Sequence, residues 1–348
     1  RQNGVLAAAD LSATLPVGIP LNIQRYWELA DGQLVLLFKV KNAGSRAVEI
    51  GSLGIPMIFN NLMHEKTLEE AHASNVFYDP YIGKDAGYLQ VTRLSGHGPA
   101  LLVVPYNKNT PFEAYSPLLD DPTPRGITFE GFYEWMVYSK AYAENEWKKA
   151  EPWNVPTSIT IQPGETREYG LKFLLADSIK GIEHKLIENK RPVAVGIPGY
   201  VLPQDVNGKL FLNYAAKVKS IQVEPVEALS VEALPQTNSP WKVYQVKGRK
   251  WGRARLTITY ADGLSQTVNY KVIKPEAEVL KDYGAFLTQK QWYENKSDPF
   301  GRDQSVITYD YEKKQQVTQD SRVWIAGLSD EGGAGSWLGA MMKELVQP

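Results

Sequence analysis

The chain has 348 residues, of which 43% are hydrophobic, and 38 basic against 39 acidic residues give a formal net charge of −1. This length suggests about two to three domains of roughly 150 residues each, with enough apolar residues to fill their cores. The balanced charge creates no field that would attract a polyanion, so nucleic acid is not an expected partner. No apolar run reaches the roughly 18 residues that a membrane span needs, and we expect no membrane partner either.

Residues 1–178 have the sequence pattern of a β-protein, in which Gly, Pro, Asn or Asp separate short runs of apolar or alternating residues. Residues 21–29 and 33–40 predict two strands joined by an Asp31-Gly32 turn. We expect further strands within residues 47–59 and 100–104, and a hairpin formed by residues 158–162 and 167–176. Many short strands with few helices predict a large antiparallel β-sandwich of the supersandwich type.

A second β-pattern follows a break in the chain. The apolar spacing within residues 178–190 indicates a short helix, and residues 191–200 read as an extended linker. Strand patterns then continue to residue 273, and the last two strands flank an Asp262-Gly263 turn. We expect a small immunoglobulin-like sandwich here. The predicted domains are residues 1–178 (large sandwich), 179–194 (helix and linker), 195–275 (small sandwich) and 276–348 (linker and start of a helical domain).

The C-terminal 70 residues differ from the sheets before them. Residues 276–292 have helical apolar spacing, a polar stretch contains Asp298-Pro-Phe-Gly-Arg-Asp303, and a helix is expected from about Ser336. The fold class is therefore mainly β, with two sandwiches and a short C-terminal helical segment.

The order of these segments, together with Asp298-Pro-Phe-Gly-Arg-Asp303, Val-Ile-Thr-Tyr-Asp310 and Ser321-Arg-Val-Trp-Ile-Ala-Gly-Leu-Ser-Asp-Glu-Gly-Gly-Ala-Gly335, resembles the N-terminal portion of an uncharacterised six-hairpin glycosidase-like family. The resemblance implies a β-sandwich packed on an (α/α)6 barrel that carries the catalytic carboxylates. It implies a C-terminal helical domain of the same precursor as the partner, and a secreted or periplasmic bacterial enzyme whose signal peptide has been removed.

The acidic pair Asp330 and Glu331 is the first candidate site, because glycoside hydrolysis uses two carboxyl groups roughly 5 to 10 Å apart. Adjacent residues do not meet that separation by themselves, so one of them would act with a partner from the barrel. The alternative is an acidic approach to a helix that Ser336 caps, and this alternative explains the pair almost as well. Trp337, which flanks the pair, is a candidate substrate contact.

The loop at Asp298, Arg302 and Asp303 offers two carboxylates and a guanidinium that could hold sugar hydroxyls. A salt-bridged turn is the alternative reading of the same residues, and it is the one that we favour.

Aromatic residues are dense in residues 131–153. Stacking of flat rings on sugar faces, with acids and amides for the hydroxyls, is a common way to bind carbohydrate. The substrate-binding candidates here are Trp147, Trp153, Trp135 and Glu134. Strand alternation assigns about half of the aromatics to packing, so Trp147 and Trp153, which lie in a polar loop, are the better candidates.

The chain has no cysteine, and its four histidines are scattered without metal-ligand spacing. Disulfides and thiolate sites are excluded, and we expect neither a metal nor another cofactor. Three functions remain: part of a glycoside hydrolase acting on a poly- or oligosaccharide by carboxylate acid/base catalysis, a carbohydrate-binding module without chemistry, or a structural support.

Overall fold

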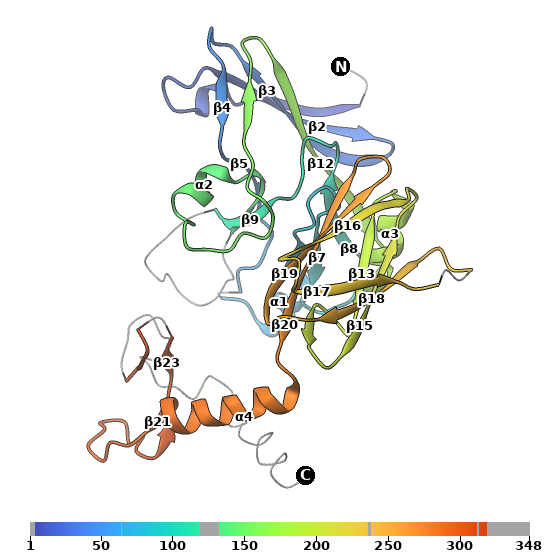
Figure 1. Ribbon diagram of the computed structural model, residues 1–348. Coiled ribbons are helices and arrows are strands. Elements are labelled where there is room, and N and C mark those ends of the chain that lie inside the picture. The colour runs from blue at the N-terminus through green and yellow to red at the C-terminus, as the bar shows by residue number, and fades with distance from the viewer. Residues whose placement is uncertain (1–3, 64, 119–131, 236–237, 312, 319–348) are drawn as a thin grey trace. The chain divides into compact units, whose positions relative to one another are not determined.

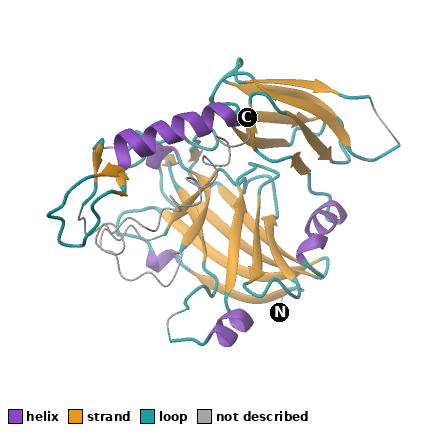
Figure 2. Cartoon of the chain, turned by 90° about the horizontal axis from the view of Figure 1, so that it is seen from below, coloured by secondary structure: helices purple, strands orange, loops and turns teal. Residues whose placement is uncertain are grey.

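The computed structural model describes residues 4–63, 65–118, 132–235, 238–311 and 313–318. The protein is mainly β, with antiparallel sheets and few helices, as the sequence predicts (Figures 1 and 2). It folds as two compact units, of which the first comprises Arg1–Tyr200, Gly208–Val246 and Arg253–Tyr270. The second comprises Val201–Asn207, Lys247–Gly252 and Lys271–Pro348. The four domain boundaries drawn from the sequence remain a prediction.

The first unit contains a seven-stranded antiparallel sheet. Its strands, in spatial order, are β1 (Val5–Asp10), β2 (Leu21–Ala30), β3 (Gln33–Asn42), β12 (Thr166–Ala176), β8 (Ala100–Pro105), β7 (Tyr88–Arg93) and β6 (Val76–Tyr81). The unit also has two smaller sheets. One has three strands in the order β5 (Leu53–Met57), β10 (Tyr133–Tyr138), β9 (Ala114–Pro117), and the other is the pair β11 (Ile159–Ile161) and β4 (Val48–Ile50).

The hairpin of β2 and β3 confirms the predicted Asp31-Gly32 turn. Both turn residues have positive φ, 52° and 73°, as a two-residue hairpin turn matching the twist of its strands requires. The ladder then runs without a shift from Ala30↔Gln33 to Leu21↔Asn42.

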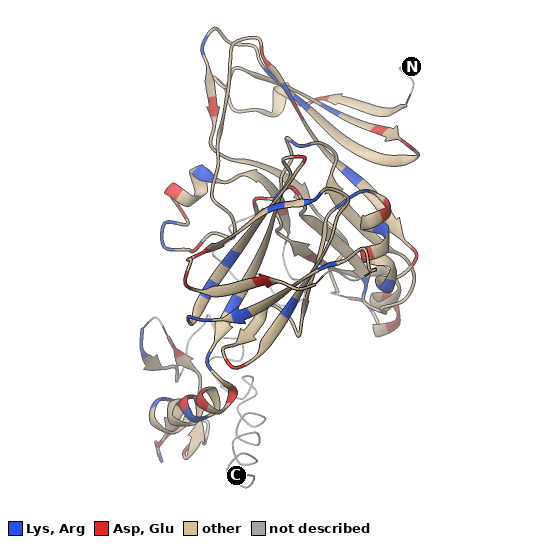
Figure 3. Cartoon of the chain, turned by 45° about the vertical axis from the view of Figure 1, so that its right-hand side comes forward, with Lys and Arg blue, Asp and Glu red and all other residues tan. Residues whose placement is uncertain are grey.

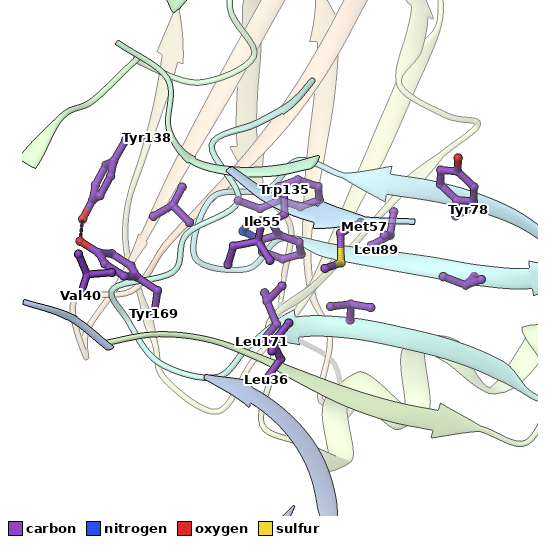
Figure 4. Packing of buried hydrophobic residues seen from close by; sticks show 14 of the residues in the cluster. Leu36, Val40, Ile55, Met57, Tyr78, Leu89, Trp135, Tyr138, Tyr169 and Leu171 are labelled. Atoms are coloured by element: carbon purple, nitrogen blue, oxygen red, sulfur yellow. Dashed lines mark hydrogen bonds between the residues drawn. The ribbon is translucent and has the colours of Figure 1, made fainter. Parts of the chain in front are cut away.

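A shared core holds the sheets together as a sandwich. Leu36, Leu89 and Leu171 come from the seven-stranded sheet, while Ile55 and Trp135 come from β5 and β10 (Figure 4). Alternation along each strand directs these side chains to one inner layer. The hydroxyls of Tyr138 and Tyr169 lie 3.5 Å apart in the same core.

The other face of β8 and β12 is covered by the predicted helix. It forms as a 3-10 turn (η2, Ile179–Gly181) followed by α3 (Ile182–Glu188), and Ile182 and Leu186 pack on Leu102 and Leu174. Burial on both faces explains why β8 reads as a continuous apolar run.

The hairpin expected from residues 158–162 and 167–176 is wrong in its pairing. A turn with Gly164 at φ 78° does reverse the chain, but β11 pairs with β4 while β12 pairs with β3 and β8. The chain therefore crosses from one layer of the sandwich to the other. The long neighbours β3 and β8 offer β12 more ladder hydrogen bonds than the three-residue β11 does. Residues 47–59, which were expected to continue the same sheet, form β4 and β5, and these two strands belong to different smaller sheets.

The small β-module consists of two four-stranded sheets. One has the order β13 (Val193–Ile197), β15 (Asn207–Asn213), β18 (Lys242–Gly248), β17 (Leu229–Ala233). The other has the order β14 (Val201–Pro203), β20 (Ser265–Ile273), β19 (Gly252–Tyr260), β16 (Val218–Glu224). The predicted Asp262-Gly263 turn joins β19 to β20, with Gly263 at φ 88° and the Tyr260 N–H donating to the Leu264 carbonyl at 2.9 Å.

The remaining elements are short. The first unit also contains η1 (Ser12–Thr14), α1 (Leu68–Ser74) and α2 (Lys140–Glu144). The described part of the second unit continues with α4 (Glu276–Phe286), the π-helical turn η3 (Leu287–Gln291), the pair β21 (Trp292–Tyr293) and β22 (Ser305–Val306), and the pair β23 (Tyr309–Asp310) and β24 (Gln315–Gln316). Helix α4 confirms the helical spacing of residues 276–292, and the helix expected from Ser336 lies outside the described residues.

Basic and acidic residues are both scattered along the ribbon of the described chain, in keeping with the net charge of −1 (Figure 3). None of the described helices is both long and apolar enough to cross a membrane.

Candidate functional site

A pocket of about 330 Å³ with aromatic walls lies in the first unit. This volume is at the lower end of the roughly 300–1,000 Å³ typical of ligand sites. We call it the Trp153 pocket; it is lined by the aromatic residues Tyr81, Tyr115, Trp153 and Tyr200, together with Pro80, Ile82, Val268 and Asn269. These residues come from β6, β9, β20 and three loops, so several parts of the chain must meet to form it.

A buried hydrogen-bond network fixes the pocket walls beside Trp153. The next residue, Asn154, donates from Nδ2 to the carbonyl of Glu113 at 2.9 Å and accepts at Oδ1 from the Thr267 hydroxyl at 2.7 Å. Tyr81 donates its hydroxyl to the Thr267 carbonyl at 2.8 Å and accepts from Gln266 Nε2 at 3.1 Å. A fully paired buried network of this kind holds its members in one arrangement.

The Trp153 ring is half exposed, at 48%, and has a cation over one face. The Arg253 guanidinium lies 4.4 Å from the ring centroid, within the range of a cation–π contact. Arg253 also pairs with the Glu151 carboxylate at 3.5 Å. The arginine therefore orders both the ring and the loop before it.

Two residues that line the pocket carry polar groups with no hydrogen-bond partner in the described protein. The buried Tyr115 hydroxyl has no hydrogen-bond partner among the described residues, although its ring stacks on Tyr133 with centroids 4.8 Å apart. Burial raises the pKa of this phenol, so it stays neutral and can both donate and accept. The Asn269 amide likewise forms no side-chain hydrogen bond within the described chain.

The Tyr81 and Tyr200 hydroxyls differ in this respect, because both are already bonded. Tyr200 accepts from the Gly196 N–H and donates to the Ala194 carbonyl, both at 3.1 Å. Tyr81 and Tyr200 therefore supply ring surface, whereas the side-chain polar groups of Tyr115 and Asn269 have no hydrogen-bond partner among the described residues. Apolar ring faces beside a few unpaired polar groups suit a ligand with both apolar faces and hydroxyls, which is the chemistry of a sugar. The described residues contain no group of three metal-ligating side chains.

The sequence matches the family described as "Family of unknown function (DUF5695)" over residues 1–348. The chain belongs to DUF5695. No curated protein matches it.

Among solved structures, one named Polysaccharide Lyase BACCELL_00875 resembles the DUF5695 chain with a TM-score of 0.70 at 16% sequence identity. The match covers 95% of this chain and 46% of that structure, so the chain spans less than half the length of the protein that it resembles. At this identity the likeness establishes a common fold. The comparisons thus find DUF5695 and a fold shared with a protein named as a polysaccharide lyase, not the six-hairpin glycosidase-like family that the sequence motifs suggested.

Of the residues predicted in the aromatic-rich segment of this DUF5695 chain, Trp153 alone lines the pocket. Trp135 is wrong as a substrate contact, because it is fully buried and stacks on Phe112 with centroids 3.7 Å apart. Its indole N–H is also used, donating to the Pro111 carbonyl at 3.0 Å. Trp135 faces the inner layer of the sandwich, where strand alternation places it.

Trp147 and Glu134 both lie near Tyr142 rather than in the pocket. Trp147 stacks on Tyr142 with centroids 4.8 Å apart. Glu134 lies against Gly54, where a Cβ atom would be 2.0 Å from its Oε2, and burial raises the pKa of Glu134. Charge on Glu134 also contributes to the raised pKa of Tyr142, after the larger effect of burial. A role of Trp147 and Glu134 in substrate binding stays a prediction.

The Asp298 loop, in the second unit, has the geometry of the salt-bridged turn. Asp298 accepts from Arg302 Nη2 at 2.6 Å and Nε at 3.1 Å, and from the backbone N–H groups of Phe300 and Arg302 at 3.0 Å. These bonds to Arg302, above all, hold the pKa of Asp298 well below its usual range. Asp303 is half-buried beside them. Because Asp298 and Arg302 are hydrogen-bonded to each other, few of their donor and acceptor groups remain available to bind a ligand.

The predicted catalytic pair Asp330 and Glu331 lies outside the described residues, as does Trp337. The pocket residues that sequence reasoning missed are Tyr81, Tyr115, Tyr200 and Asn269. Each sits in an ordinary strand or loop pattern, and their separation along the chain leaves no local signal that would group them.

Proposed function

We propose that this chain is the sugar-binding β-region of a carbohydrate-active enzyme that cleaves a polysaccharide. The observation that carries the proposal is the Trp153 pocket, where ordered ring surface lies beside the Tyr115 hydroxyl and the Asn269 amide, which are not hydrogen-bonded within the described part of the chain. Aromatic residues supply rigid contact area at a low cost in conformational entropy, which suits the binding of a pyranose face.

Two separate observations bear on the reaction class, and they favour different reactions. The sequence motifs favour hydrolysis by paired carboxyl groups, with Asp330 and Glu331 as candidates. The fold shared with a protein named as a polysaccharide lyase favours eliminative cleavage instead. Of the two we favour the lyase, since the likeness covers 95% of this chain. Its active centre would be completed by a C-terminal helical domain of the same precursor, in a secreted or periplasmic bacterial protein.

Isothermal titration of the purified 348-residue chain with defined hexasaccharides tests the binding role. The panel contains cellohexaose, mannohexaose, xylohexaose and hexagalacturonate, so that neutral and acidic chains are both represented. We expect one of them to bind, and Trp153→Ala to weaken the binding of that sugar at the pocket at least tenfold, because the ring provides the largest apolar contact there.

Trp251→Ala is the matched control, because Trp251 is also an exposed tryptophan with a cation over its ring, at 60% exposure, but does not line the pocket. The Trp251→Ala variant should bind the same hexasaccharide with the affinity of the parent chain. If no hexasaccharide binds, or if both tryptophan variants lose affinity equally, the proposed function is wrong.

A further inference from the structure

A second cavity in the first unit, of about 300 Å³, has a different chemical character. Its polar lining includes Asp85, Lys108, Arg191 and Asp262, with the ring of Tyr106 beside them. Nothing in the proposed function uses this group of residues.

Arg191 is the central feature of the cavity. Its Nη2 donates to the backbone carbonyl of Asp85, while its Nε is buried without a hydrogen-bond partner among the described residues. Burial lowers the pKa of Arg191 to about 10, so the guanidinium remains charged at neutral pH. A buried donor of a charged group costs stability when it is unpaired, and proteins keep such donors rarely.

The two carboxylates of the cavity are held in place by the protein's own donors. Asp85 Oδ2 accepts from the Ser265 N–H at 2.9 Å. Asp262 accepts from the Leu264 N–H at 3.1 Å and from the Tyr214 hydroxyl at 2.6 Å. These bonds orient both carboxylates but leave acceptor capacity, because each carboxylate has about four lone-pair sites.

The charges that line the cavity balance. Two carboxylates, Asp85 and Asp262, face two cations, Lys108 and Arg191, so the lining gives no net attraction to an anion. It offers fixed donors and acceptors side by side, which complement the adjacent hydroxyls of a sugar, each of which both donates and accepts. Tyr106, 42% exposed, adds ring surface. Its position needs Gly170, where a Cβ atom would meet the ring at 3.0 Å.

We propose that this cavity, which we call the Arg191 cavity, is a second saccharide subsite that binds the hydroxyls of a neutral sugar residue through Arg191, Asp85 and Lys108. The inference rests on the proposed function, since both sites would take parts of the same class of glycan. It adds a substrate preference: the polysaccharide contains neutral residues that this cavity recognises by hydrogen bonds rather than by charge.

The test is the stoichiometry of binding in the hexasaccharide titration. We expect two equivalents of a neutral hexasaccharide per chain. Arg191→Lys, which keeps the charge but loses the fork of donors, should weaken one equivalent at least tenfold, and Trp153→Ala should weaken the other. Lys108→Ala, at an exposed rim position where folding is not at risk, should weaken the same equivalent as Arg191→Lys by about fivefold.

The outcomes separate the two proposals. A single equivalent that is lost in Trp153→Ala and kept in both Arg191→Lys and Lys108→Ala overturns the second subsite and leaves the proposed function intact. A second equivalent that forms only with hexagalacturonate overturns the preference for a neutral sugar. No binding of any probe overturns both proposals.

Discussion

The guanidinium of Arg253 lies 4.4 Å above the indole of Trp153. Arg253 stands on β19, whereas Trp153 belongs to a loop some hundred residues earlier in the chain, and the same arginine also contacts the Glu151 backbone carbonyl. One face of the tryptophan is thereby covered. A ring held in this way loses little freedom when a ligand binds, which favours affinity.

Replacing Arg253 with methionine removes this cation while keeping an apolar side chain. We expect the dissociation constant for the glycan to rise about two- to fivefold, the equivalent of a cation–π contact at an exposed site. Titration calorimetry measures this change. Glu151→Gln is the control, because it removes the ion pair and leaves the ring contact; unchanged affinity in Arg253→Met would show that the cation does not order the ring.

Tyr115→Phe removes a hydroxyl that has no partner among the described residues. We expect the free energy of unfolding to stay the same or rise slightly, while glycan affinity falls about fivefold through loss of one hydrogen bond. Tyr270→Phe is a matched control, since the Tyr270 hydroxyl is also buried without a described partner but does not line the Trp153 pocket. Equal effects of both variants on affinity would argue against a ligand at Tyr115.

The raised pKa of Glu134 should be visible in the pH dependence of the free energy of unfolding. Burial raises the pKa of Glu134 above 4.5 in the folded protein, so ionisation costs more there than in the unfolded chain. Its contribution is therefore most favourable below pH 4.5 and is lost as the pH rises through the folded value. Glu134→Gln should gain stability relative to the parent chain as the pH rises from 4 to 7, measured by urea unfolding.

The variant Glu165→Gln should show the opposite change of stability with pH. The backbone N–H of Gln162, and then Arg167, lower the pKa of Glu165, so its stabilisation is present above pH 4.5 and is lost as the pH falls. This variant should be less stable than the parent at pH 7 and approach it toward pH 4. The same trend in both variants would contradict the assignment for Glu134.

Glu113 is a buried carboxylate, 3% exposed, that four donors satisfy. Its Oε1 accepts from the Ser139 N–H at 2.8 Å and hydroxyl at 2.6 Å and from the Thr157 N–H at 2.9 Å, and its Oε2 accepts from the Thr157 hydroxyl. Glu113→Ala should cost about 3 kcal/mol in the free energy of unfolding, because buried donors lose their acceptor. Glu113→Gln should cost less, since one oxygen remains.

Urea unfolding at pH 7 measures both losses, with Glu49→Ala as the exposed control. Glu49 also accepts from a hydroxyl and from Lys140, but it lies at the surface, and its loss should cost less than about 1 kcal/mol. Similar losses at positions 113 and 49 would mean that the buried carboxylate does not join Ser139 to the Thr157 segment.

The sequence by itself determined the class of fold and its local turns. Both Asp-Gly turns formed where they were expected, because each needs a residue with positive φ, which glycine adopts without strain. Alternation and apolar runs likewise predicted the sandwich and the helices at residues 178–190 and 276–292. It also indicated Trp153 as a ligand candidate, since a tryptophan in a polar loop has no core to enter.

Only the tertiary structure decided which strands pair and which side chains share a cavity. The turn at Gly164 reverses the chain whether or not β11 and β12 pair, and the choice depends on the neighbours that other segments supply. Nothing in the sequence around Tyr115 or Arg191 indicates that the Tyr115 hydroxyl and the Arg191 Nε have no partner among the described residues. Hydrogen bonding and burial of a side chain depend on residues distant in the sequence, and those residues meet only when the sheets have packed.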